Sequence, residues 1–382
     1  MIAVIADDFT GAAEIGGVGV RYGLRVLIET VVNGVYDVDL LVIATDTRSM
    51  GAVEASSHVT TIMMQLMKLN PEFIYKKIDS VLRGHVAEEL EAMMLQMGRK
   101  KALVVAPNPL VGRKIEDGTY FVDGVPLDQT FFTGDPDFPV RSARVMEIIQ
   151  SNTFPVYSLD LLNDIPSTGI FMANVINHGE LKKWAEKIDN EVIVAGGSGF
   201  FDAILETKFQ FSISANQPEF SFGENSLFIF GSLFPKSQSL LKKFDNKNML
   251  RSNMPESIYY SNELAEALVE EWAIEVADKL QEGFSVMVTI DYPPSGEEGL
   301  SCRIRECIGQ LVARIADRFE LTDLFIEGGA TTSMVLKYLE ITKLEPFYEA
   351  DFGVIQMRPE GFPGLCITTK PGSYQWPENL EF

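Results

Sequence analysis

Short runs of apolar residues, rich in valine and isoleucine, alternate along the chain with stretches of helical spacing. Uninterrupted apolar runs of this length are typical of strands that are covered on both faces. The runs lie at residues 2–6, 40–44, 102–106, 192–195, 227–230, 286–290 and 324–326. Helical spacing covers residues 53–69, 86–97, 261–280 and 304–319. The alternation predicts an α/β fold with two domains, each with a mainly parallel sheet flanked by helices.

A polar, turn-forming stretch without a clear period lies at residues 210–225, directly before the apolar run at 226–230. The chain has 382 residues, enough for two domains of ordinary size. We therefore expect one domain at 1–215 and a second at 225–382.

The chain is acidic, with 54 Asp and Glu residues against 32 Lys and Arg residues and a formal net charge of -22. This balance argues against non-specific binding to nucleic acid or to an anionic membrane, since both need a basic face. An anionic ligand would need a local basic cluster, so each such cluster is informative.

Three cysteines and three histidines are scattered, which predicts neither a disulfide framework, a zinc site nor a histidine-dependent triad. The apolar run at the N-terminus is too short for a signal peptide and has no basic region before it. No apolar run has the length of a membrane span. The expected location is the cytoplasm.

Several expected strands end in a turn rich in glycine or serine. These turns lie at residues 7–12, 196–199, 231–232 and 327–332. In open α/β sheets, ligands bind beyond the carboxyl ends of the strands, and such turns expose backbone N–H groups that favour anions. One turn is weak support because βα loops need glycine for geometry alone, but four favour anion binding moderately. Neither a Walker pattern nor a G-x-G-x-x-G after a strand occurs.

The densest polar cluster is Lys76–Gly84, which contains two lysines, Asp79, Ser80 and Arg83. Arginine presents a rigid fork that matches a carboxylate, and a neighbouring aspartate could accept the proton of a substrate hydroxyl. The alternative, a solvated loop whose charges pair among themselves, has equal weight on this cluster alone. Arg48 and Arg113 add guanidiniums near other strand ends and suggest an anionic substrate, although at least one of the three arginines should form a structural ion pair.

Taken together, these segments resemble the four-carbon acid sugar kinase family, which includes kinases for threonate, erythronate and oxo-tetronates. The resemblance spans nearly the whole chain, and its N-terminal motifs are the more specific ones. It rests on Asp-Asp-Phe-Thr-Gly-Ala at 7–12, Asp-Thr-Arg-Ser at 46–49, Lys-Lys-Ile-Asp-Ser-Val-Leu-Arg-Gly at 76–84, the glycine-rich 327–332 and the turn at 370–373.

The resemblance implies that the N-terminal domain holds a sugar acid and that the C-terminal domain holds ATP with Mg²⁺. The implied catalytic residues are Asp79, Asp8 and Lys77. The implied substrate-binding residues are Asp7, Thr10, Arg48, Ser49, Lys76, Arg83 and Arg113. The implied nucleotide-binding residues are Ser232, Gly328, Gly329, Ala330, Thr331 and Gly372.

Three residues depart from the family pattern. Ala330 stands where the glycine loop commonly carries an acidic residue, Asp46 replaces a lysine, and Pro371 lies inside the C-terminal turn. We expect these three positions to affect which substrate the protein uses more than they affect its fold.

The sequence therefore predicts a phosphotransferase with an alcohol group as acceptor. Asp79 or Asp8 would orient or deprotonate the hydroxyl, and Arg83 and Arg48 would clamp the substrate carboxylate. Lys76 or Lys77 would stabilise the transferring phosphoryl group. One alternative is a degenerate relative that binds without turnover. Another is an isomerase or aldolase, against which the lack of a convincing Schiff-base lysine or metal-ligand cluster counts weakly. A homodimer is compatible with this interpretation, although no residue indicates one.

Overall fold

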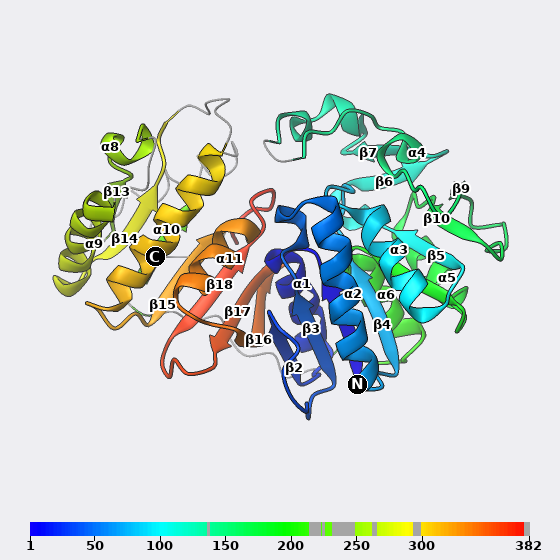
Figure 1. Ribbon diagram of the computed structural model, residues 1–382, viewed down its shortest axis with the longest axis horizontal. Coiled ribbons are helices and arrows are strands. Elements are labelled where there is room, and N and C mark those ends of the chain that lie inside the picture. The colour runs from blue at the N-terminus through cyan, green and yellow to red at the C-terminus, as the bar shows by residue number, and fades with distance from the viewer. Residues whose placement is uncertain are drawn as a thin grey trace. The chain divides into compact units, whose positions relative to one another are not determined.

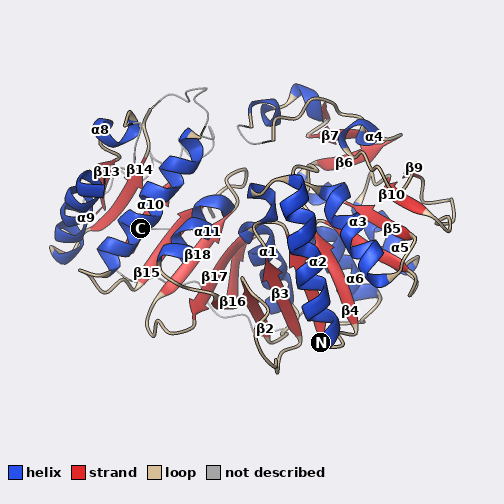
Figure 2. Ribbon diagram, in the orientation of Figure 1, coloured by secondary structure: helices blue, strands red, loops and turns tan. Residues whose placement is uncertain are grey.

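The structure is a computed structural model that describes residues 1–135, 138–213, 223, 226–230, 249–261, 266–292 and 299–377. The chain divides into two compact units, Met1–Ala215 and Asn216–Phe382. Figure 1 follows the chain through both units, and Figure 2 separates their helices from their strands.

Unit 1 is built on a parallel sheet with strand order β2-β3-β1-β4-β11-β5-β10-β9. Its strands are β1 (Ile2–Ala6), β2 (Val26–Glu29), β3 (Leu40–Ala44), β4 (Phe73–Lys77), β5 (Lys101–Val105), β9 (Val156–Leu159), β10 (Gly169–Ala173) and β11 (Val192–Gly196). Its helices are α1 (Phe9–Arg21), α2 (Ala52–Lys68), α3 (Val86–Met97), α4 (Val145–Ile148), α5 (His178–Glu186) and α6 (Ser198–Thr207). Every residue of β1, β3, β10 and β11 is buried, as the uninterrupted apolar runs predict.

A small antiparallel sheet, which the sequence analysis did not predict, follows β5 in unit 1. It has the order β6-β7-β8, with β6 (Arg113–Glu116), β7 (Thr119–Val122) and β8 (Val125–Pro126). An Asp-Gly pair joins each hairpin, and the φ angles of Asp117 and Gly118 are 47° and 69°. Such pairs favour two-residue hairpin turns because both central residues need positive φ.

Unit 2 has the strand order β13-β14-β12-β15-β18-β17-β16. Its strands are β12 (Ser226–Phe230), β13 (Met249–Asn253), β14 (Ser285–Thr289), β15 (Asp323–Glu327), β16 (Lys343–Asp351), β17 (Val354–Pro359) and β18 (Cys366–Lys370). Its helices are α8 (Glu256–Tyr259), α9 (Glu266–Gln281), α10 (Leu300–Ala316) and α11 (Gly329–Tyr338). The first five strands in this order run parallel, whereas β16, β17 and β18 form an antiparallel meander.

The α/β class with mainly parallel sheets is confirmed. One local difference matters for the site: Lys76 and Lys77 are the last two residues of β4 and are buried, so they do not lie in a solvated loop. None of the described helices is both long enough and apolar enough to cross a membrane.

Candidate functional site

The carboxyl ends of β1 and β4 flank a topological switch point in unit 1. These strands are neighbours, with Ala6 in register with Lys77. From β1 the chain leads through α1 to β2 on one side of the sheet, and from β4 it leads through α3 to β5 on the other side. Ligands of open α/β sheets bind in the crevice at such a point. The aspartates of the N-terminal motif follow β1 directly, and Asp79 follows β4.

Asp8 is the N-cap of α1 and both of its carboxylate oxygens are engaged. Oδ1 accepts from the backbone N–H of Gly11 at 2.9 Å, and Oδ2 accepts from the hydroxyl of Thr10 at 2.6 Å. Burial acts to raise the pKa of Asp8, but Arg48, Lys77 and these hydrogen bonds outweigh it and hold the pKa below its ordinary value. Asp8 is therefore a fixed, ionised cap.

Arg48, from the turn after β3, connects the two adjacent aspartates. Its Nε donates to Oδ2 of Asp7 at 2.9 Å, and its Nη2 lies 3.1 Å from Oδ1 of Asp8. The other oxygen of Asp7, Oδ1, is buried and accepts no hydrogen bond. Burial raises the pKa of Asp7, and the opposing effects of Arg48 and Lys76 do not cancel the shift.

Asp79 organises the loop between β4 and α3. Its Oδ1 accepts a hydrogen bond from Nη2 of Arg83 at 2.8 Å, and its Oδ2 accepts one from Nε of Arg83 at 3.0 Å, so the contact is bidentate. Oδ2 also accepts the backbone N–H groups of Val81 and Arg83, at 3.1 and 3.2 Å. Burial acts to raise the pKa of Asp79, yet Arg83 and Arg48 hold it far below its ordinary value. Nη1 of Arg83 donates to Asp135 at 2.7 Å.

The two lysines of β4 point to opposite faces of the sheet, because successive side chains in a strand alternate. Lys76 is fully buried, and its Nζ lies 2.7 Å from Oε2 of Glu89 on α3. Lys77 lies 3.5 Å from Oε2 of Glu14 on α1. Sequence reasoning missed both glutamates. The sequence feature that could have indicated them is an acidic residue on the apolar face of a predicted helix, because a buried charge needs a partner.

Other predicted substrate residues occupy varied positions. Arg113, in β6, donates to the hydroxyl of Ser80, and the ring of Phe132 lies 5.9 Å from its guanidinium. Ser49 is exposed, and its hydroxyl donates to Oδ2 of Asp46 at 2.7 Å. The hydroxyl of Ser49 is thus bound to Asp46, outside the Arg48–Asp7–Asp8 contacts.

The turn after β11 has a steric reason for its glycines. A Cβ on Gly196 would lie 2.3 Å from the carbonyl oxygen of Val105, and a Cβ on Gly197 would lie 2.9 Å from that of Ala106. The close approach of β11 to the end of β5 explains both glycines without a ligand.

Unit 2 has its own switch point at the carboxyl ends of β12 and β15. These strands are neighbours, and the chain leads from β12 towards β13 on one side and from β15 towards β16 on the other. Gly328 follows β15 with φ 99° and precedes α11, whose first residues are Gly329, Ala330 and Thr331. The N–H of Gly328 donates to the carbonyl of Lys370 at 2.9 Å. Ser232, also predicted at the nucleotide, lies outside the described residues.

A buried ion pair supports the glycine loop. Nζ of Lys370, the last residue of β18, lies 3.0 Å from Oε2 of Glu327, the last residue of β15. The same ammonium donates to the carbonyls of Pro371 and Tyr374 at 2.9 and 2.8 Å, which fixes the turn that contains Gly372. Sequence reasoning missed this pair. The feature that could have indicated it is a pair of opposite charges, one at the end of each strand.

Three tyrosines cluster at the same carboxyl edge. Tyr259 and Tyr260 follow β13, and Tyr292 follows β14. Ring centroids lie 4.4 Å apart for Tyr259 and Tyr292, which stack, and 5.0 Å apart for Tyr259 and Tyr260. The side chain of Tyr260 is 59% exposed. Since β14 and β15 both pair with β12, the strand ends before Tyr292 and before the glycine loop are about two strand spacings, or roughly 10 Å, apart. Tyr259 and Tyr260 follow β13, which lies one strand further along the sheet.

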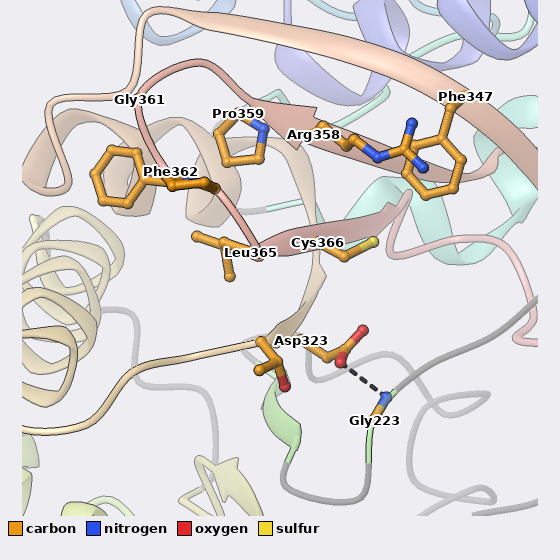
Figure 3. Close-up of a pocket in the computed structure, with 12 residues that line it drawn as sticks. Gly223, Asp323, Phe347, Arg358, Pro359, Gly361, Phe362, Leu365 and Cys366 are labelled. Atoms are coloured by element: carbon orange, nitrogen blue, oxygen red, sulfur yellow. Dashed lines mark hydrogen bonds between the residues drawn. The ribbon is translucent and has the colours of Figure 1, made fainter.

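A pocket of about 520 Å³ lies at the opposite edge of the unit 2 sheet. Its lining includes Asp323 and Cys366, which begin β15 and β18, and Oδ2 of Asp323 accepts from the N–H of Gly223 at 2.8 Å (Figure 3). The guanidinium of Arg358 lies 3.9 Å from the ring centroid of Phe347. None of the predicted nucleotide residues that the structure describes lines this pocket.

Two domain families match the chain. The sugar-binding N-terminal domain matches residues 2–204, and the nucleotide-binding C-terminal domain matches residues 227–374.

Relatives of known name resemble the chain over different lengths. A D-threonate kinase of Salmonella typhimurium is 37% identical over 44% of this chain, and the match spans only 40% of that kinase. A D-erythronate kinase of Heliobacterium modesticaldum is 33% identical over 40% of this chain and 36% of its own length. A 3-oxo-tetronate kinase of Brucella melitensis is 25% identical over 98% of this chain and 92% of its own length.

Solved structures share the fold. A Salmonella typhimurium protein described as a tRNA synthase superposes with a TM-score of 0.79 at 19% identity, over 98% of this chain and 96% of its own. The Haemophilus influenzae protein HI1011 superposes with a TM-score of 0.68 at 21% identity, over 97% and 96%. At these identities the likeness concerns the fold alone. The two domain matches cover most of the sequence, and the chain belongs to the four-carbon acid sugar kinase family.

Proposed function

We propose that the chain is an ATP-dependent kinase that phosphorylates a hydroxyl of a small sugar acid, in particular a four-carbon acid such as a tetronate or an oxo-tetronate. The observation that carries this proposal is the buried carboxylate–guanidinium network at the switch point of unit 1. It joins Asp7, Asp8 and Asp79 to Arg48 and Arg83. The names of the relatives support the same reaction, and the domain matches support sugar binding by unit 1 and nucleotide binding by unit 2.

The carboxylate of the substrate would bind at Arg48 and Arg83. Their side chains are 17% and 18% exposed, whereas Lys76 is fully buried, so the arginines form the accessible part of the network. Asp135 already places a carboxylate oxygen 2.7 Å from Nη1 of Arg83, which supports the fit of an anionic group there. Lys76 instead serves to neutralise Glu89 inside the domain.

The phosphoryl group would meet Lys77 and the first turn of α1. The ammonium of Lys77 lies close to Gly11, since a Cβ built there would be 3.0 Å from Nζ. A positive charge beside a helix N-terminus favours the charge that develops on a transferring phosphoryl group.

ATP would bind through its phosphates at Gly328, Gly329 and Thr331, whose backbone lies at the start of α11. The exposed ring of Tyr260 would stack on the base, as aromatic side chains commonly do with nucleobases. Mg²⁺ in kinase sites usually keeps water ligands and needs only one or two protein carboxylates besides the phosphates. The described residues hold no group of three or more His, Cys, Asp or Glu side chains that would bind the ion without the phosphates. When bound, the ion would neutralise phosphate charge.

Release of ADP from Mg-ATP across a panel of sugar acids tests this function. The panel holds threonate, erythronate, their 2- and 3-oxo forms and longer aldonates, with no acid as the control. Binding without turnover, which Ala330 suggests as an alternative, would appear as thermal stabilisation by ligands with no ADP released. The cytoplasmic location and the homodimer expected from the sequence stay predictions.

A further inference from the structure

The three aspartates at the switch point of unit 1 differ in how their oxygens are occupied. Both oxygens of Asp8 and both oxygens of Asp79 accept hydrogen bonds. Asp7 is only 2% exposed, and its Oδ2 lies 2.9 Å from Nε of Arg48, whereas its Oδ1 accepts none. A buried acceptor left without a donor is costly, and in a native site it indicates a missing partner such as a ligand.

The charged groups that face Asp7 set its basicity. Arg48 and Lys76 favour its ionised form, while Asp8 and Glu89 oppose it, and burial is the largest influence. The pKa of Asp7 is raised as a result, whereas the pKa values of Asp8 and Asp79 are lowered. A carboxylate with a raised pKa and an oxygen that accepts no hydrogen bond is better matched to proton transfer near neutral pH than a carboxylate with a lowered pKa and both oxygens occupied.

We propose that Asp7, through Oδ1, binds the hydroxyl that is phosphorylated and accepts its proton, while Asp79 and Asp8 are positioning residues. This assignment rests on the proposed kinase function. The hydroxyl oxygen forms a bond to the γ-phosphorus as its O–H bond breaks and the proton passes to Oδ1. The bond from the γ-phosphorus to the bridging oxygen breaks, and ADP leaves with that electron pair. Solvent later takes the proton from Asp7.

The positioning roles follow from the contacts. Asp79 holds Arg83 bidentately and ties down the backbone at Val81 and Arg83, so its loss would displace the arginine that binds the substrate. Asp8 caps the N-terminus of α1 by accepting from the backbone N–H of Gly11. Neither role requires a proton to move.

The test compares Asp7→Asn with Asp79→Asn, using a sugar acid that the wild-type protein phosphorylates. Asp7→Asn should lower kcat by about 10²- to 10⁴-fold, the range typical of a lost general base. It should also abolish the fall in kcat at acidic pH. Asp79→Asn should raise KM for the acid and lower Tm, while keeping the acidic fall in kcat.

The wild-type protein gives a readout that no folding defect can affect. Its kcat should fall on acidification around a pKa above the ordinary aspartate value of about 3.9. A profile that stays flat down to that value, or an Asp7→Asn variant with undiminished kcat, would overturn the role of Asp7 and leave the kinase function intact. A wild-type protein that releases no ADP with any acid would overturn the proposed function and this role with it.

Discussion

The guanidinium of Arg83 holds the carboxylate of Asp79 through two parallel hydrogen bonds, 2.8 Å from Nη2 to Oδ1 and 3.0 Å from Nε to Oδ2. The remaining Nη1 donates to Asp135. Asp79 therefore orients Arg83, and the nitrogen that faces away from Asp79 is the one that a substrate carboxylate would use.

Replacing Arg83 should weaken transition-state binding by about 2–4 kcal/mol, because a fixed guanidinium contact to a charged group would be lost. Arg83→Ala should thus lower kcat/KM for the sugar acid by roughly 30- to 1,000-fold while KM for ATP changes little. Arg83→Lys should recover little, since an ammonium cannot form the bidentate contact. Arg25→Ala, which removes an exposed arginine paired with Asp39, is the control in steady-state kinetics. An Arg83→Ala value near that of the control would remove Arg83 from the site.

Breaking the buried pair of Lys76 and Glu89 should destabilise unit 1 strongly. Lys76→Met leaves a buried carboxylate without its partner, which costs about 3–5 kcal/mol in the free energy of unfolding. Urea unfolding measures this cost. Lys182→Met breaks the exposed pair with Glu206 and should cost at most about 1 kcal/mol. If the two variants lower the free energy of unfolding equally, the buried Lys76 pair stabilises the protein no more than an exposed pair does.

Asp79 should stabilise the protein at neutral pH and less so in acid. Its pKa is lower in the folded protein than in the unfolded chain, so its ionised form stabilises the fold above the unfolded value of about 3.9. This contribution is lost as the pH falls below that value towards the folded pKa. The stability gap between wild type and Asp79→Asn, from urea unfolding at several pH values, should be largest at neutral pH and narrow below pH 4. A gap that widens in acid would contradict the network.

Tyr260 should contribute to nucleotide binding and to nothing else. Tyr260→Ala removes an exposed ring and should weaken ADP binding by about 1–3 kcal/mol, the usual value of base–aromatic stacking. Tyr260→Phe keeps the ring and should bind ADP like the wild type in titration calorimetry. Tyr157→Ala, at a tyrosine of β9 that is 47% exposed, is the control. If ADP binds equally to the alanine variant of Tyr260 and to the wild type, the base lies elsewhere.

The fold could be predicted because buried parallel strands leave an uninterrupted apolar run, as in β1 and β15. The small antiparallel sheet and the meander of β16 to β18 could not, since their strands mix polar and apolar residues. The run of residues 76–84 pointed to the correct edge of the sheet. For the two lysines the alternative of a solvated loop is wrong, because their partners Glu89 and Glu14 come from helices that only the fold brings near.

The roles of the aspartates show where sequence reasoning ends. Asp79 was expected to act on the hydroxyl because Arg83 stands near it, and Asp8 because of the family resemblance. In the structure Arg83 occupies the oxygens of Asp79, the first turn of α1 occupies those of Asp8, and the pKa values of both are lowered. The free oxygen of Asp7 depends on the angle at which Arg48 approaches, and residue spacing does not encode that angle. The tyrosine cluster likewise joins Tyr259 and Tyr292 across 33 positions of sequence.

The most direct test of the central claim is ADP release from Mg-ATP by the purified protein, measured with the panel of four-carbon sugar acids and with no acid. The account predicts acid-dependent ADP release with at least one member, accompanied by a phosphorylated acid as product. If no member of the panel causes ADP release while ADP still stabilises the protein in thermal unfolding, the result would contradict the account. It would indicate a protein that binds nucleotide without transferring phosphate.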